Sequence, residues 1–556
     1  MSQEFLTALP HWLAADLSPH SHPLPLPLVA AQFGAFDQIS WIIISFLLTQ
    51  TAGTPLWGRM ADTFGRRECM NFALVSFLIG SIGCALAPNF ATLVVFRAVQ
   101  GIGGGGIFAC ALICVADLVP AHQRGAYIGP LAAVFGLSGV VGPILGGVLT
   151  DGPGWPYVFW INIPICLVCI ANVTLFVPKY LGRGHLAVLV EGGAALKPSE
   201  AASSGSQELQ LETGTIDYAG IVAIVSAVVC FCLGVNWGGS KYDWSSAPIV
   251  GLLCGAALFL ALFCLIETCY ASNPIIPLRL FGIRNFTVGA IINLAAGIVM
   301  TGSYVFLPVF FQYVFLQSAT ESGKQLIPMA VGLPVGAMLS GGLMTAFPRL
   351  GYRLWQILGS CAMIAATVLY TQFTASTPQY HIIGCMVLGG LALGPSVQVP
   401  LLAAQNAVDL KDEAVTSSTM TFFQSIGGLL GAAIMQTLLN NKIAAELAPI
   451  TARIAAVYGP STAPSTGSFD VRSLAGLPPP LDTVYADAIS AFGRSCSFVF
   501  WVCVAGAVVT TLASCCMEHI PLKGGAEAAA ADAAKAPRAE PAAAAMAVRE
   551  PAAPAV

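Results

Sequence analysis

The chain has 556 residues, of which 56% are hydrophobic and only 9% are charged. Soluble domains carry about 25% charged residues, so this composition excludes an ordinary water-soluble protein and makes the lipid bilayer the expected solvent. The net charge of −4 at pH 7 argues against nucleic-acid binding. The 17 cysteines lie mostly in apolar runs and are interpreted as small buried residues rather than disulfides or metal ligands, with lipidation of Cys515 and Cys516 as an alternative.

Helical membrane spans are expected along most of the chain, because about 20 mostly apolar residues cross about 30 Å of hydrocarbon. All the candidate stretches are rich in small residues, which let helices approach closely in lipid. We therefore predict an all-α polytopic membrane protein with about 13 spans. The expected spans are Ile39–Leu56, Met70–Ala87, Ala91–Ala116, Ala126–Thr150, Pro156–Val177, Asp217–Asn236, Ala247–Glu267, Phe286–Phe311, Lys324–Phe347, Arg353–Thr371, His381–Ala403, Thr416–Leu439 and Cys496–Met517.

The lysines and arginines predict the orientation. If the loop after Leu56 is cytoplasmic and the sides alternate from there, most basic residues outside the spans fall on the cytoplasmic side, as expected for membrane proteins. The C-terminus is then cytoplasmic. An odd number of spans places the N-terminus outside, unless a first span is missing or degraded within residues 1–38, where a proline-rich run interrupts the apolar sequence.

The first cytoplasmic loop, Gly58–Arg67, combines glycines with an acidic residue among arginines. The glycines are expected to permit tight turns between two closely linked spans. The charged residues can latch two helical bundles together and release them as they move, whereas a simple positive-inside anchor would need only the arginines. The expected gating residues are Gly58, Arg59, Asp62, Gly65, Arg66 and Arg67.

Arg97 lies inside the span Ala91–Ala116, three residues before Gln100 and on the same helix face. An ionisable residue inside a span is expensive and is usually functional or paired. The alternative is that its long side chain reaches back to the membrane interface.

The span Ala126–Thr150 carries a row of glycines and one proline. Their helical spacing predicts a smooth, kinkable face on which a neighbouring helix can slide or pivot. Ordinary small-residue packing is the alternative, which explains the glycines well but the Gly-Pro pair poorly. The residues are Gly139, Gly142, Pro143, Gly146 and Gly147.

These three patterns resemble the major facilitator superfamily, and the chain from about residue 37 to 523 is similar to its fungal-type branch of fourteen-span drug:proton antiporters. The loop Gly58–Arg67 resembles the family's G-x-x-x-D-x-x-G-R-R/K signature, Arg97 to Gly101 its R-x-x-Q-G motif, and Gly139 to Gly147 its antiporter motif. The resemblance implies two six-helix bundles plus two extra central spans, a proton-coupling role for Arg97 and Gln100, and export rather than uptake.

The chain departs from that branch in two places. Trp155-Pro156-Tyr157 stands where the branch has W-R-W, so a basic residue is lost. Leu6 to Pro10 resembles the end of the branch's first span, whose acidic residue would precede Met1. A transport-inactive remnant or sensor therefore stays among the alternatives.

The predicted units follow the spans and the polar stretches between them. They are an atypical N-terminus (1–38), an N-terminal bundle (39–178), a cytoplasmic linker (179–216), two extra spans (217–268), a C-terminal bundle (269–439), an extracytoplasmic loop (440–492), the last span (493–519) and a disordered cytoplasmic tail (520–556).

A substrate cavity is expected near the midplane, between the two bundles. Carboxylates are scarce inside the spans, so the cavity suits neutral or apolar compounds, or anionic ones near Arg97, and it suits basic amino acids less. Each polar candidate could equally be a packing group. The candidates are Gln50, Asn162, Asn293, Tyr304, Gln312, Gln398 and Gln424.

The predicted function is a proton-coupled exporter of drugs, toxins or other small organic compounds. A vacuolar amino-acid:proton exchanger of the same branch is the alternative transporter. An enzyme is not expected, because the spans offer no catalytic constellation. Protons, a small-molecule substrate and the bilayer are the expected partners of a monomer without metal or cofactor, in the plasma membrane rather than the vacuolar membrane.

Overall fold

The computed structural model describes residues 33, 41–118, 142, 145–146, 148–149, 152–177, 217–239, 242–270, 276–317, 319–347, 351–409, 412–458 and 482–518. Within these ranges the chain is helical, and extended backbone pairs only at one bridge between Gly238 and Tyr242. Ten helices are long and apolar enough to cross a membrane, which confirms the predicted all-α membrane fold. Two further expected spans form α3 (Trp41–Phe64) and α10 (Tyr218–Trp237), whereas Ala126–Thr150 lies almost wholly outside the described residues.

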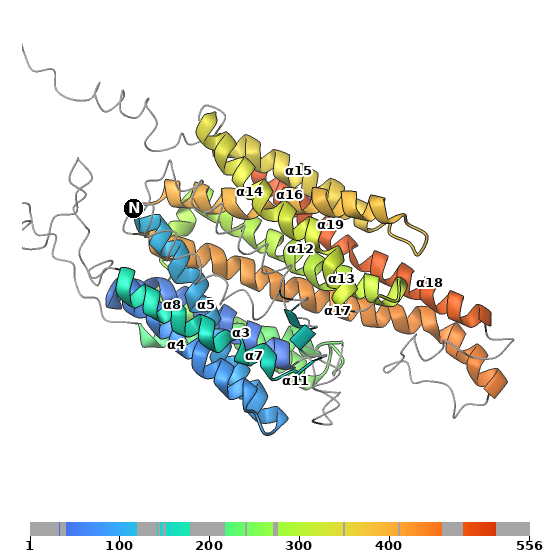
Figure 1. Ribbon diagram of the computed structural model, residues 1–556. Coiled ribbons are helices and arrows are strands. Elements are labelled where there is room, and N and C mark those ends of the chain that lie inside the picture. Colours follow the sequence, from blue (N-terminus) through green and yellow to red (C-terminus); the bar gives the residue numbers. More distant parts are fainter. Residues whose placement is uncertain are drawn as a thin grey trace, which may run out of the picture.

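The N-terminal bundle is built around one glycine-rich helix (Figure 1). α5 (Phe90–Leu118) packs against both α3 and α4 (Arg66–Ala85), and α4 packs against α7 (Tyr157–Trp160) and α8 (Asn162–Phe176). A Cβ atom added at Gly101 would come within 2.3 Å of the Phe46 carbonyl oxygen, and one added at Gly103 within 2.4 Å of the Phe77 backbone nitrogen. The glycines of α5 are therefore required for close helix contact, as expected for packing in lipid.

The C-terminal bundle repeats this kind of packing in several helix pairs. α12 packs against α17, α14 against α16, and α15 against α16 and α19. Gly297 of α12 faces the Gln424 carbonyl, and Gly390 of α16 faces the Met329 carbonyl. The elements are η2 (Leu278–Gly282), α12 (Arg284–Val314), α13 (Ala319–Gln325), α14 (Ile327–Ala346), α15 (Gly351–Tyr370), α16 (Gln379–Ala407), α17 (Glu413–Tyr458), α18 (Asp482–Val499) and α19 (Trp501–Cys515).

The two bundles share apolar clusters at one end of the molecule. We call this the Gly65 end, and the opposite end the Trp41 end. Near the Gly65 end, one cluster joins Ile107 and Ile113 of α5 to Phe286 and Ala404 of the C-terminal bundle. A second joins Val115 of α5 to helices α12, α14, α15 and α16. The bundles are therefore packed together at the Gly65 end.

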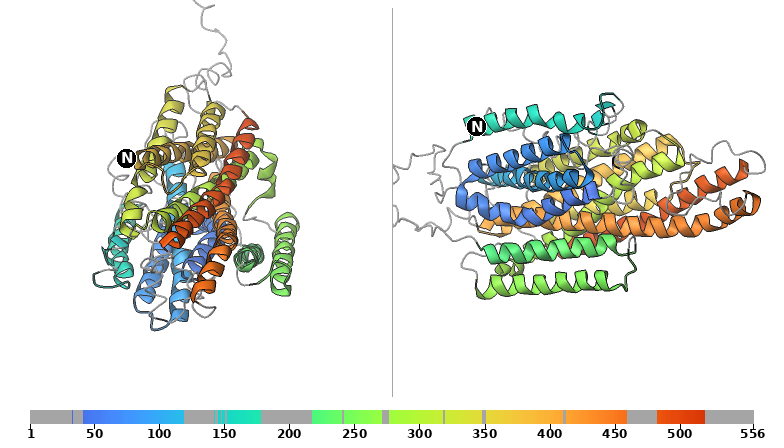
Figure 2. Two further views of the ribbon diagram at one scale, coloured as in Figure 1. Left: turned by 90° about the vertical axis from the view of Figure 1, so that its right-hand side faces the viewer. Right: turned by 90° about the horizontal axis from the view of Figure 1, so that it is seen from below.

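Two helices run beside the bundles rather than within them (Figure 2). α10 packs against α3, α17 and its antiparallel partner α11 (Ala247–Cys269). Only 17% of the span in α11 is buried within the protein, and its mean hydropathy is 2.8. The helix therefore turns most of its surface outward, and a continuous apolar helix surface of this length is expected to face lipid.

Two helices continue beyond the expected spans. α3 runs on through Gly58 to Phe64, so Gly58 is helical, and the prediction of a turn at this glycine is wrong. α17 has 46 residues, equivalent to about 69 Å at 1.5 Å per residue, against about 30 Å of hydrocarbon. Residues 440–458 and 482–492, expected as loop, are helical.

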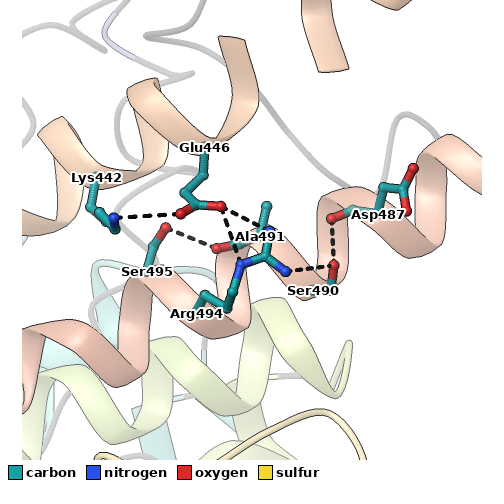
Figure 3. A network of polar contacts seen from close by, with 7 residues as sticks. All are labelled: Lys442, Glu446, Asp487, Ser490, Ala491, Arg494 and Ser495. Carbon is teal, nitrogen blue, oxygen red and sulfur yellow. Dashed lines mark hydrogen bonds and ion pairs between the residues drawn. The ribbon is translucent and has the colours of Figure 1, made fainter. Parts of the chain in front are cut away.

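The extension of α17 pairs with α18 (Figure 3). Leu447 and Ile450 pack against Phe492 and its neighbours in a separate small cluster. Glu446 accepts hydrogen bonds from Arg494 at 2.8 Å and 3.2 Å and forms an ion pair with Lys442 at 3.4 Å. Apolar contact and opposite charge together hold this helical pair.

The cysteines are all free thiols. Cys166 and Cys169 have the C-x-x-C spacing, but both are buried in α8, consistent with small packing residues. Five cysteines are exposed instead of buried, and for these the expected burial is wrong: Cys254, Cys269, Cys361, Cys515 and Cys516. Over the described ranges, no group of three or more His, Cys, Asp or Glu side chains is placed to hold a metal ion.

Candidate functional site

The junction between α3 and α4 depends on Gly65. Its φ of +94° and ψ of 152° lie where residues with a side chain are strained. Its amide donates to the Ala61 carbonyl, and its carbonyl accepts from the Cys69 amide, both at 3.2 Å. The chain therefore passes from one helix into the next within a single residue, which confirms a tight turn at this glycine.

Arg67 and Asn71, which follow the turn, tie α4 to α8. Arg67 donates from Nη2 to the Thr174 carbonyl, and Asn71 donates to the Thr174 hydroxyl at 3.2 Å. Arg66 is 7% exposed. The side chains of Arg59 and Asp62 lie outside what the structure describes, so the expected latch is represented by Arg66 and Arg67. Arg67 acts here within the N-terminal bundle rather than between the bundles.

Arg97 is the most deeply enclosed charge of the described spans, with 1% of its surface exposed. Its Nε donates to the Ile42 carbonyl of α3 at 3.0 Å, and its Nη1 donates to Gln100 Oε1 at 2.8 Å. Gln100 Nε2 then donates to Ser81 Oγ of α4 at 2.8 Å, and this hydroxyl donates to the Phe77 carbonyl. One hydrogen-bonded chain thus joins α3, α5 and α4.

Aromatic rings contribute to the enclosure of the Arg97 guanidinium. The guanidinium carbon lies 4.7 Å from the centre of the Phe46 ring and 5.8 Å from that of Phe159. A cation over an aromatic face is stabilised by about 0.5–2 kcal/mol, more when water is excluded. Arg97 is therefore held among α3, α5 and α7, and the structure does not favour the alternative in which it reaches to the membrane interface.

The chemistry of this site follows from its composition. An arginine stays protonated in proteins and presents donors only. All the partners described above are neutral carbonyl, amide or aromatic groups, so the positive charge is solvated by dipoles rather than balanced by the acids described here. Arg97 can therefore act as a fixed positive charge, but it is not itself the group that takes up and releases protons.

The glycine-rich antiporter segment is only partly described. Gly142 and Gly146 are helical and buried. Gly139, Pro143 and Gly147 lie outside the described residues, so the kink expected at Gly142-Pro143 stays a prediction.

The cavity candidates come from both bundles. In the N-terminal bundle, Gln50 packs against Gly105, and Asn162 is 1% exposed at the start of α8. In the C-terminal bundle, Asn293 Nδ2 donates to the Gly289 carbonyl at 3.0 Å and lies 3.7 Å from the Met420 sulfur. Gln424 Nε2 lies 3.6 Å from the sulfur of Met300.

The remaining candidates are in the same C-terminal bundle. Gln312 Nε2 donates to the Ser322 hydroxyl at 3.0 Å. Gln398 is 4% exposed on α16, and Tyr304 is half-buried on α12. The structure therefore places all seven on membrane helices, while their part in a substrate cavity stays a prediction.

Sequence reasoning missed the partners that make the arginine site. Ser81 gave no signal, since a serine in a membrane helix commonly bonds its own backbone four residues earlier, as it also does here. The Ile42 carbonyl and the Phe46 and Phe159 rings are generic in sequence and become partners only through helix packing. Gly80 was missed as well: a Cβ there would come within 2.5 Å of the Gln100 backbone nitrogen, a close approach that arises only when α4 packs against α5.

A two-bundle helical membrane fold with a buried arginine and a glycine turn defines a class of membrane transporters, and the comparisons with known proteins agree. Residues 21–432 match the model of the Major Facilitator Superfamily. The chain belongs to this family, and it is a transporter of the membrane-embedded kind.

Several relatives are similar over most of the chain. An uncharacterized MFS-type transporter of Mycobacterium tuberculosis is 32% identical over 89% of this chain, which spans 66% of that relative's length. Multidrug resistance protein 3 of Bacillus subtilis is 29% identical, covering 90% of this chain and 91% of the relative. The rubrofusarin-specific efflux pump of Gibberella zeae is 29% identical, covering 90% and 86%. The resemblance to efflux pumps, fungal ones included, is thereby confirmed.

The fold is also that of a solved transporter. The crystal structure of the human organic anion transporter MFSD10 superimposes with a TM-score of 0.52 at 14% sequence identity, covering 91% of this chain and 97% of that one. At this identity the likeness concerns the fold alone.

Proposed function

We propose that the chain exports small organic compounds in exchange for protons, by alternating access between its two bundles. The observation that carries this proposal is the enclosed Arg97 with its chain of bonds to Gln100 and Ser81. A positive charge kept away from water is costly, so the presence of Arg97 on α5 is expected to serve a function. A fixed charge of this kind lowers the proton affinity of any acidic group that comes near it.

The export direction is supported by the relatives and by the glycine-rich segment. Two similar proteins are named as a multidrug resistance protein and as an efflux pump for rubrofusarin. The basic residues favour a cytoplasmic location for the Gly65 end. Two apolar clusters shared by the bundles lie near this end, which supports the proposal that the bundles are closed against each other on the cytoplasmic side.

The substrate class follows from the polar groups available. The described amides of the C-terminal bundle can accept or donate hydrogen bonds but carry no charge, and the deeply buried Arg97 of α5 is positive. Uncharged or weakly acidic organic molecules with polar groups fit such surroundings better than cations do. We therefore propose compounds of this kind as substrates, transported from the cytoplasm across the plasma membrane.

The proposal is tested with purified protein in liposomes. Fluorescein serves as the anionic probe and ethidium as the cationic one, and each is followed with and without an imposed pH gradient. We expect gradient-driven transport of fluorescein, abolished by a protonophore and smaller for ethidium. Equal flux with and without the gradient would refute proton coupling, and a preference for ethidium would refute the substrate class.

A further inference from the structure

The α10–α11 pair lies along the seam where the two bundles meet (Figure 2). One apolar cluster there takes side chains from α3 of the N-terminal bundle, from α10 and α11, and from α17 of the C-terminal bundle. Representative members are Leu48 of α3, Val228 of α10 and Phe422 of α17. α10 therefore covers the line between the bundles, and α11 covers α10 on the outer side.

The turn between α10 and α11 reaches both bundles at the Trp41 end. On one side, the Trp237 ring meets the Trp41 ring of α3 edge to face, with centres 5.7 Å apart and planes at 67°. On the other side, Gly239 lies against α17, where an added Cβ would come within 2.9 Å of the Thr437 methyl carbon. The two contacts differ in kind: an edge-to-face pair of aromatic rings joins the turn to α3, whereas glycine backbone without a side chain contacts α17.

The described part of the turn is stiff, because backbone hydrogen bonds hold it together. The Gly239 amide donates to the Tyr242 carbonyl at 2.8 Å, and the Tyr242 amide donates to the Trp237 carbonyl at 3.1 Å. Gly239 has a φ of +70°, where other residues are strained. A Cβ added at Gly238 would come within 2.6 Å of the Trp244 ring. The turn is therefore built to present glycine backbone, without a side chain, to α17.

A stiff helical pair cannot stay fixed to both bundles if these rock against each other. One of the two contacts must therefore change during the movement, and their chemistry indicates which one. Aromatic pairs are stabilised by about 0.5–1.5 kcal/mol beyond their buried area, and α10 also packs more extensively on α3 than on α17. A methyl group on glycine backbone makes only dispersion contacts, which change little as one surface moves over the other.

We propose that the α10–α11 pair travels with the N-terminal bundle and slides over α17 at Gly239, keeping the seam between the bundles covered from lipid throughout the transport cycle. This rests on the alternating access of the proposed function. Trp41 and Trp237 are the attachment, and Gly239 and Thr437 are the sliding contact.

A reversible cross-link tests the sliding contact. Gly239→Cys with Thr437→Cys places two Cβ atoms close enough for a disulfide, whose Cβ–Cβ separation is about 3.5–4.5 Å. The exposed native cysteines are first replaced by serine. We expect the oxidised pair to transport fluorescein at least ~10-fold more slowly than the same protein after reduction, because the sliding contact is locked. Each single cysteine variant, treated with the same oxidant, is the control. An oxidised pair as fast as the reduced one would overturn the proposal.

A second measurement does not depend on transport or on replacing a glycine. Spin labels are placed on the turn at Asp243→Cys, on the N-terminal bundle at Leu86→Cys and on α17 at Asn441→Cys, all exposed positions. Between pH 5.5 and pH 8 in liposomes, we expect the 243–86 distance distribution to stay narrow and unmoved. The 243–441 distribution should be broader or shifted. If it is as narrow and as unmoved as the first, the sliding proposal fails, whereas gradient-independent flux in the earlier assay counts against the proposed function.

Discussion

The arginine site of the N-terminal bundle and the contact between α12 and α17 in the C-terminal bundle use polar groups differently. Around Arg97, the guanidinium donates to the Ile42 carbonyl of α3 and to Gln100 of its own helix, and the neutral Gln100 amide then donates to Ser81 of α4, so that short hydrogen bonds join three helices. Between α12 and α17, the amides bond to their own helix or lie beside sulfur: Asn293 bonds the Gly289 carbonyl, and Gln424 faces Met300.

This difference suggests a division of labour. Charge-assisted hydrogen bonds are about twice as strong as neutral ones, so the arginine chain resists rearrangement. Sulfur is a weak acceptor, so an amide beside it loses little when a better partner arrives. The N-terminal bundle is accordingly expected to hold a fixed charge and a fixed helix arrangement. The C-terminal bundle is expected to supply amides that turn toward a substrate.

Removing the charge should have the largest effect. Arg97→Ala removes the donor to the Gln100 amide oxygen and the additional donor to the helical Ile42 carbonyl, and a buried polar group left without a partner costs about 1–3 kcal/mol. We expect at least ~100-fold slower gradient-driven transport of fluorescein in liposomes. Arg97→Lys keeps the charge but loses the planar set of guanidinium donors. Its transport rate should lie between those of the wild type and Arg97→Ala. Wild-type flux in the alanine variant would show that Arg97 has no part in coupling.

The sequence predicts some residues of the turn and of the arginine site, but not others. The turn at Gly65 could be predicted locally, because the pattern of glycines and charged residues that indicates it lies within the single segment Gly58–Arg67. Arg97 stands out because a charge inside a span is rare. Ser81 and Phe159 carry no such signal, since they join the site only when α4 and α7 pack against α5. The extension of α17 beyond the membrane was missed because residues 440–458 are too polar for a span, while a helix outside lipid needs only an amphipathic face.

Crowding the arginine chain tests whether its geometry matters apart from its charge. In Gly80→Ala, the new methyl would approach the Gln100 backbone nitrogen to 2.5 Å, forcing α4 away from α5 and stretching the bond between Gln100 and Ser81. Overpacking of this kind costs about 1–3 kcal/mol. A lower melting temperature and roughly 10-fold slower transport are expected, measured by thermal denaturation in detergent and by the liposome assay.

Two further glycine variants serve as controls that separate an effect on transport from an effect on stability. Gly427→Ala crowds the Leu294 carbonyl in the C-terminal bundle, and Gly251→Ala on α11 meets nothing within 4 Å. The first should lower the melting temperature about as much as Gly80→Ala, and the second should leave it unchanged. If the transport rate followed the melting temperature identically in both bundles, the arginine chain would have no special role beyond stability.

Among the polar side chains, Gln424→Leu should have the smallest effect on stability, and it is the most informative variant for the substrate. The variant gives up a single weak contact with the Met300 sulfur, so the free energy of unfolding should change by less than about 1 kcal/mol. If the amide turns toward the substrate, KM for fluorescein should rise several-fold while the maximal rate stays close to that of the wild type, because uniform binding is lost without altering the helix movement. Asn293→Leu is the matched comparison, since its amide is already bonded to the Gly289 carbonyl and should affect KM less. An unchanged KM in Gln424→Leu would place substrate binding elsewhere and make the amides of both bundles packing groups.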